Sequence, residues 1–156
     1  METVIIDTRE KPKAIQTILK QFEAAGVNSI RSKLYSGDYQ LMSNPYLVVD
    51  RKQSLSELCN NVVQDHRRFR DELVRAKEVG ISVVVLVEHG GAIKSIEDVP
   101  NWVNPRLKVS PLAVSGERLY RIMHNTAARY GFEWAFCDKV HTGKKIIEIL
   151  GGGADA

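Results

Sequence analysis

GDYQLMSNPYLVVDRK, residues 37–52, combines two aspartates and a lysine with an apolar run. The run at 46–50 is aromatic and β-branched and ends in charge, a pattern typical of a buried strand that delivers its last residues to a site. Side chains two positions apart on a strand point the same way. We therefore expect Asp50 and Lys52 to lie side by side, while Arg51 points elsewhere.

A second carboxylate is expected to join this pair. Residues 39–42 can pair with the 46–50 run through a turn at 43–45, which contains serine, asparagine and proline. Such a hairpin returns Asp38, which lies twelve positions upstream of Asp50, to the neighbourhood of that residue.

Two nearby carboxylates and a lysine predict a metal site. Carboxylates held close together repel one another, whereas Mg²⁺, or Mn²⁺ in its place, takes oxygen ligands and tolerates several waters. Hydrolysis of a phosphodiester needs a positioned water and a cation near the developing charge, which a metal and Lys52 could supply together. The same spacing also fits a strand that simply ends in solvated charge.

The N-terminal segment contributes further acids. Residues 3–6 form an apolar run, and the charged exit that follows places Asp7 and Glu10 near a strand terminus, where sites form in α/β proteins. An alternative is that Asp7 caps the following helix, because aspartate is a preferred capping residue.

Helical and strand patterns alternate along the chain. Helices are expected at 13–25, 54–63 (with a capping box of Ser54 and Glu57), from a cap at Asp65, at 115–129 and at 144–150, and further strands at 27–34, 81–87 and 132–136. This alternation predicts the α/β class, as a three-layer sandwich with a central mixed sheet and helices on both faces. We expect one domain, residues 1–150, and a disordered tail at 151–156.

The densest basic cluster follows Asp65 and comprises Arg67, Arg68 and Arg70. These side chains could neutralise phosphates, but basic residues on an exposed helix also commonly form a solvated face.

The 89–111 segment lacks a regular pattern, and we expect an exposed loop. Trp102 could stack on a base or sugar there while Arg106 and Lys108 hold phosphate. Alternatively, Trp102 anchors the loop onto the core.

Composition limits the classes of function. A chain of 156 residues with a net charge of +3 fits one domain, and its affinity for nucleic acid would have to come from local basic clusters. No segment approaches about 18 consecutive apolar residues, so no membrane span is expected and we predict a soluble, intracellular protein. The histidines show no zinc-type spacing, and no glycine-rich loop followed by lysine marks a nucleotide site.

Three sequence blocks resemble those of XPF-type structure-specific DNA endonucleases, a branch of the PD-(D/E)xK nucleases: IIDTRE at 5–10, GDY at 37–39 and DRK at 50–52. Arg68-Phe69 and the apolar run at 81–88 extend the resemblance. It implies a restriction-endonuclease-like fold, DNA as the partner, a role in DNA repair or recombination, and a homodimer.

The resemblance also implies roles for individual residues. Asp7, Asp38 and Asp50 would bind Mg²⁺ or Mn²⁺, and Glu10 would act as an auxiliary acidic ligand. Lys52 would orient the attacking water or help to deprotonate it.

Arg9 and Arg68 would contact the scissile phosphate. Two departures from the family pattern affect the fine geometry: Asp50 stands where the family usually has glutamate, and Glu57 lies one position later than the usual aspartate.

The first hypothesis for function is therefore a metal-dependent endonuclease that cuts DNA at branched or flapped structures. One alternative is a non-catalytic DNA-binding or scaffold module of the same fold, although retention of all the acids and of Lys52 argues against it. Another is a junction resolvase from a different PD-(D/E)xK branch.

Overall fold

The computed structural model describes residues 2–64 and 66–151. The strands are β1 (Thr3–Ile6), β2 (Asn28–Arg31), β3 (Tyr39–Leu41), β4 (Asn44–Lys52), β5 (Ser82–Glu88) and β6 (Glu133–Cys137). The α-helices are α1 (Gln16–Ala24), α2 (Leu55–Cys59), α3 (His66–Glu78), α4 (Gly116–Tyr130) and α5 (Thr142–Gly151). Short helices of other types are η1 (Pro12–Ile15), η2 (Asn60–Gln64), η3 (Ile96–Asn101), η4 (Pro105–Lys108) and η5 (Lys139–His141).

Two predicted features fall wholly or partly on residues that the structure does not describe. The predicted cap at Asp65 and residues 152–156 of the predicted tail lie outside the described residues. Gly151, the first residue of that tail, belongs to α5. None of the helices in the described ranges has both the length and the apolar character needed to cross a bilayer.

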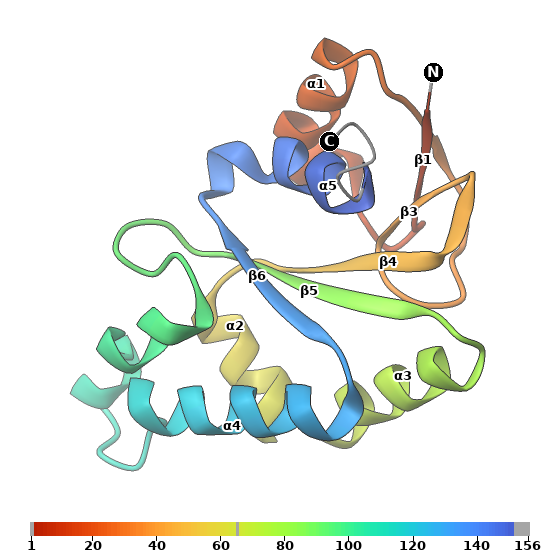
Figure 1. Ribbon diagram of the computed structural model, residues 1–156. Coiled ribbons are helices and arrows are strands. Elements are labelled where there is room, and N and C mark those ends of the chain that lie inside the picture. The colour runs from red at the N-terminus through yellow and green to blue at the C-terminus, as the bar shows by residue number, and fades with distance from the viewer. Residues whose placement is uncertain (1, 65, 152–156) are drawn as a thin grey trace.

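The six strands form one mixed sheet in the order β2-β1-β3-β4-β5-β6. β1 runs parallel to β2, β4 to β5 and β5 to β6, whereas β3 is antiparallel to both β1 and β4. Figure 1 shows α1 and α5 on one face of the sheet and α2, α3 and α4 on the other. The predicted α/β sandwich with a mixed sheet is confirmed.

Alternation along β4 determines which residues face each layer. Val48 packs in the core formed with α2, α3 and α4, whereas Val49 packs in the core formed with α1 and α5. Because the side-chain period of a strand is two, Asp50 and Lys52 lie on the same face of the sheet as Val48, and Arg51 lies on the same face as Val49. The charged end of β4 therefore presents two different groups to the two faces of the sheet.

The hairpin of β3 and β4 brings Asp38 to the end of β4, as predicted. The Asp38 N–H donates to the Val49 carbonyl at 2.8 Å. Gly37 has a φ of 75°, and a Cβ at this position would lie 2.8 Å from Val48. Only glycine allows this backbone conformation and this close approach without strain, so Gly37 fixes the position of Asp38.

The segments after β4 differ in part from the predicted elements. Ser54 caps the helix as expected, because its Oγ accepts from the Glu57 N–H at 3.0 Å. Glu57 accepts from the N–H of Gln53, one residue before the position that a full capping box would use. The helix changes from α to π geometry at Asn60. The 89–111 segment, expected as a loop, contains the 3₁₀ helices η3 and η4.

Candidate functional site

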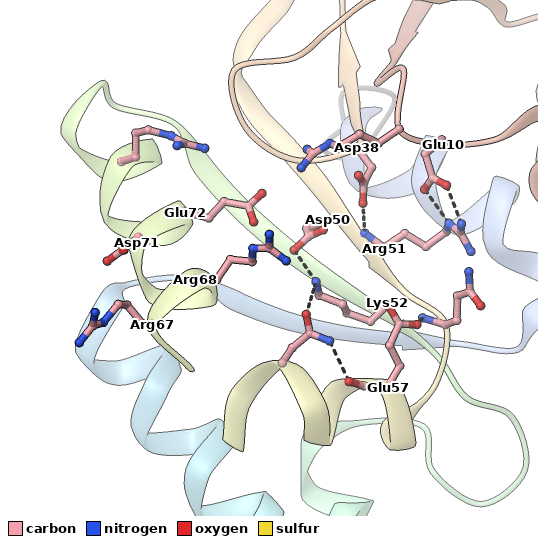
Figure 2. A pocket seen from close by; sticks show the side chains of 14 residues that line it. Glu10, Asp38, Asp50, Arg51, Lys52, Glu57, Arg67, Arg68, Asp71 and Glu72 are labelled. Atoms are coloured by element: carbon pink, nitrogen blue, oxygen red, sulfur yellow. Dashed lines mark hydrogen bonds and ion pairs between the residues drawn. The ribbon is translucent and has the colours of Figure 1, made fainter. Parts of the chain in front are cut away.

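A charged cleft of about 800 Å³ lies at the end of β4, between the β1 exit, α2 and α3. Its acidic lining residues are Glu10, Asp38, Asp50, Glu57, Asp71 and Glu72. Its basic lining residues are Arg9, Arg51, Lys52, Arg67, Arg68 and Arg75. Figure 2 shows the acids of the β-strand side facing the side chains of α3 across this space.

Asp38 and Asp50 form the centre of the cleft. Asp38 Oδ2 accepts a hydrogen bond from the Arg51 N–H at 2.8 Å, which ties it to the strand that carries Asp50. Burial raises the pKa of Asp38 well above its usual range, and the nearby charges of Asp50 and Glu10 raise it further. Two carboxylates that repel one another in this way form a site that a cation would stabilise.

Lys52 lies beside Asp50, as predicted. Its Nζ is 3.4 Å from Asp50 Oδ2 and 3.4 Å from Asn61 Oδ1, and it lies 5.6 Å from the centre of the Phe69 ring. Burial alone would lower the pKa of Lys52, but the charges of Asp50, Glu72 and Asp38 together outweigh burial and raise it. Lys52 is therefore an ammonium group that can orient a water molecule, and in this state it cannot accept a proton.

Arg51 points to the opposite face and forms a buried ionic network. Its guanidinium donates from Nε and Nη2 to the two Glu10 oxygens at 2.7 and 2.6 Å, and from Nη1 to Glu88. The Thr142 hydroxyl donates to the other Glu88 oxygen. Both oxygens of Glu10 are thus bound to Arg51, so the structure places this predicted auxiliary ligand in a role that holds the end of β4 in position.

Glu88 offers a test of this network. Glu88→Ala should lower the free energy of unfolding by about 3–5 kcal/mol, because it leaves a buried Arg51 charge partly uncompensated. Glu88→Gln should cost less, since the amide oxygen still accepts hydrogen bonds. Chemical denaturation measures both, with the exposed Glu133→Ala as a matched control. An unchanged midpoint for Glu88→Ala would mean that Glu10 alone compensates Arg51.

Asp7, a predicted metal ligand, lies outside the lining of the cleft. Its Oδ1 accepts from the Leu34 N–H at 2.8 Å, and its Oδ2 accepts from the Arg9 N–H at 3.0 Å and from Arg9 Nε at 2.6 Å. Burial alone would raise the pKa of Asp7, but the hydrogen bonds from Arg9 and Leu34 lower it. The carboxylate joins two loops, and its binding of metal stays a prediction.

The predicted basic cluster divides along α3. Arg67 and Arg68 line the cleft, whereas Arg70 is not among the lining residues and lies 3.4 Å from Asp71. Arg9, predicted to contact the scissile phosphate, also lines the cleft.

The predicted loop contacts lie elsewhere. Trp102, Arg106 and Lys108 do not line the cleft. Trp102 is partly buried, packs against the core and meets His89 edge-on at 6.3 Å between ring centres. This placement favours the alternative in which Trp102 anchors the loop, and contact of these three residues with DNA stays a prediction.

Three acids at or beside the site were not predicted from the sequence: Asp71 and Glu72, which line the cleft, and Glu88, which binds Arg51. Glu72 points across the cleft toward Asp50 (Figure 2), and burial together with the charge of Asp50 raises its pKa. Its position four residues after Arg68 places both on one face of α3, which was the available signal. Glu88 ends an apolar strand in charge, the same pattern that identified Asp50.

The donor set of the cleft fits a hard divalent cation. Within residues 2–64 and 66–151, no three His, Cys, Asp or Glu side chains are grouped so that they could hold an ion by themselves. Mg²⁺ commonly uses only one or two carboxylates and completes its coordination with water and substrate phosphate. Asp38 and Asp50 supply such a pair.

Comparisons with known proteins identify the family of this chain and structures of similar fold. The ERCC4 domain matches residues 6–143. The structure of XPF from Aeropyrum pernix is 24% identical, with a TM-score of 0.66 over 97% of this chain and 65% of that chain. XPF from Aeropyrum pernix in complex with DNA is 23% identical, with a TM-score of 0.68 over 99% of this chain and 66% of that chain.

This chain therefore spans slightly less than two thirds of the length of those two structures. No curated protein matches it. The family match covers most of the sequence, includes the three motif blocks except for Ile5 and confirms the resemblance to XPF-type nucleases: the chain belongs to the ERCC4 domain family.

Proposed function

We propose that this protein is a Mg²⁺- or Mn²⁺-dependent endonuclease that hydrolyses DNA phosphodiester bonds at branched or flapped structures. The observation that carries the proposal is the cleft in which Asp38 and Asp50 meet the ammonium group of Lys52. Membership of the ERCC4 domain family supports it. So does the likeness of the fold to an XPF structure in complex with DNA.

Each group of the cleft has a part in this chemistry. Asp38 and Asp50 would hold the cation, which would supply Lewis-acid stabilisation and a more acidic bound water. Lys52, as an ammonium group, would orient water and stabilise charge that develops on the phosphate. Arg9, Arg67 and Arg68 would bind the DNA backbone, because arginine donates several hydrogen bonds to phosphate oxygens.

Matched DNA substrates test the proposal directly. A linear duplex, a flap, a fork and a four-way junction of shared sequence are incubated with the intact chain in Mg²⁺, Mn²⁺ or EDTA. We expect cleavage of flap and fork in either metal, slower cleavage of the linear duplex, and none in EDTA.

Other outcomes identify the alternatives. Binding without cleavage in every metal would support a non-catalytic module, and selective cleavage of the four-way substrate would support a resolvase. A homodimer is part of the proposal and is tested by sedimentation of the free chain. An intracellular location is also part of the proposal, because it is where DNA substrates occur.

A further inference from the structure

A second cavity of about 360 Å³ adjoins the cleft and is not used by the chemistry described above. Its lining consists of Asp7, Thr8, Arg9, Lys33, Leu34, Tyr35 and Arg75. Arg9 and Arg75 also line the cleft that holds Asp38 and Asp50, so the two cavities share a wall.

The charge of this second cavity is positive. Arg9 is paired with Asp7 at 2.6 Å, and these two charges cancel. Lys33 and Arg75 remain, and neither makes an ion pair with any residue in the described ranges. Two uncompensated cations in a cavity beside a phosphodiester-cleaving centre provide attraction for a phosphate group.

Tyr35 adds an aromatic surface to the cavity. Its relative exposure is 53%, although a large apolar ring usually gains stability from burial. The Arg75 guanidinium lies 5.5 Å from the centre of the ring. An exposed ring with an adjacent guanidinium is the combination on which single-stranded nucleic acid stacks its bases.

The backbone around Tyr35 is held in place. The Asp7 carboxylate accepts from the Leu34 N–H on one side and from Arg9 on the other, which joins the β1 exit to the loop that carries Tyr35. The buried side chain of Leu34 anchors the same loop. The cavity is therefore supported by contacts that do not depend on a bound ligand.

We propose that this cavity binds one unpaired nucleotide of the DNA substrate, next to the scissile phosphate, with its base on Tyr35 and its phosphate on Lys33 and Arg75. The base must be unpaired, because the stacked faces of a duplex are not available to an aromatic side chain. The inference rests on the proposed function and gives that function a structural preference: an unpaired strand beside the cleavage point adds binding that a continuous duplex lacks.

Equilibrium binding in EDTA tests the cavity without cleavage. The intact chain is titrated onto a fluorescent duplex and onto the same duplex with a single-stranded thymidine flap. Tyr35→Ala should weaken flap binding by about 5-fold to 150-fold, the range for loss of one stacked base, and leave duplex binding unchanged. Tyr35→Phe should bind as wild type does. Tyr46→Ala, which removes another exposed tyrosine outside both cavities, is the matched control.

Charge and position give independent readouts. Lys33→Met should lower the slope of log affinity against log salt by about 0.7 on the flap substrate, as expected for one lost single-strand phosphate contact. A 5-iodouracil at the first unpaired position should cross-link to Tyr35, as mapped by mass spectrometry. Thermal midpoints of all variants confirm that they are folded.

Failure of this inference is distinct from failure of the proposed function. If wild type binds and cuts flaps but Tyr35→Ala binds them equally well, the cavity is not a nucleotide site and the nuclease proposal stands. If the Tyr35 effect and the cross-link are present but no metal supports cleavage, the nucleotide site stands and the nuclease proposal fails. If the wild-type protein binds neither the duplex nor the flap substrate, the nucleotide site and the nuclease proposal are both wrong.

Discussion

Asp38→Asn and Asp50→Asn are each expected to reduce cleavage in Mg²⁺ by at least about 10³-fold, because each removes the charge that holds the cation and leaves side-chain size unchanged. Single-turnover rates on the flap substrate measure the loss, and calorimetric titration with Mg²⁺ measures the accompanying fall in ion affinity. Asp138→Asn, an exposed aspartate outside the cleft, is the matched control. Cleavage by either cleft variant at the wild-type rate would falsify the assignment.

Although Asp38→Asn should reduce cleavage, it should increase the stability of the metal-free protein. The pKa of Asp38 is raised in the folded state, so the stability it contributes is present at low pH and is lost as the pH rises through this raised pKa. At mildly alkaline pH in EDTA, the neutral amide removes the repulsion from Asp50 and can still accept from the Arg51 N–H.

We therefore expect the metal-free variant to gain on the order of 1 kcal/mol, or about 2–4 °C in Tm for a chain of this length. Mg²⁺ should raise the Tm of wild type more than that of the variant. A metal-free variant that melts below wild type would show that the Asp38 carboxylate stabilises the fold, so that the two acids do not oppose one another.

Loss of activity with gain of stability separates a functional acid from a structural one. Replacement of a carboxylate such as Asp7, whose oxygens accept three hydrogen bonds, should lower both the activity and the stability of the protein. The sequence assigned Asp7 and Asp38 the same role, metal binding, because both belong to motif blocks that resemble those of XPF-type nucleases. Their hydrogen-bond partners distinguish them.

The centre of the site could be predicted because it depends on local rules. The period of two along β4 separates Asp50 and Lys52 from Arg51, and a short hairpin returns Asp38. Both rules act within sixteen residues, the 37–52 stretch, so the pattern of apolar and turn residues was sufficient to place these groups.

The outer parts of the site depend on long-range packing that periodicity does not encode. Glu88 and Thr142 are 54 residues apart in the sequence and meet only because β5 and α5 pack together. Glu72 and Arg75 lie on an amphipathic helix, where a polar pattern does not distinguish a face that lines a cleft from one that faces solvent. The environment of Trp102 could not be predicted from the sequence either, because the exposure of its indole depends on how the loop packs against the core.

Lys52→Met is expected to lower the single-turnover rate by about 10²–10³-fold, with little change in affinity for uncleaved DNA measured in EDTA. The substitution keeps an apolar stem of similar length and deletes the ammonium group that lies beside Asp50 and over the Phe69 ring. Because the charge of Asp50 raises the pKa of Lys52, the ammonium form persists at neutral pH, and its contribution is to the transition state. Lys20→Met, an exposed lysine on α1, is the matched control.

The rate and the affinity together decide what Lys52 does. An equal loss in both would make Lys52 a phosphate clamp, because uniform binding of substrate and transition state does not raise the rate of the bound complex. Lys52→Arg keeps the charge but replaces a compact ammonium with a larger, planar guanidinium whose donors point in fixed directions. If charge alone is needed, this variant should retain most of the activity. If a donor must point at one water, it should be nearly as slow as Lys52→Met, and the residue then acts by orienting that water.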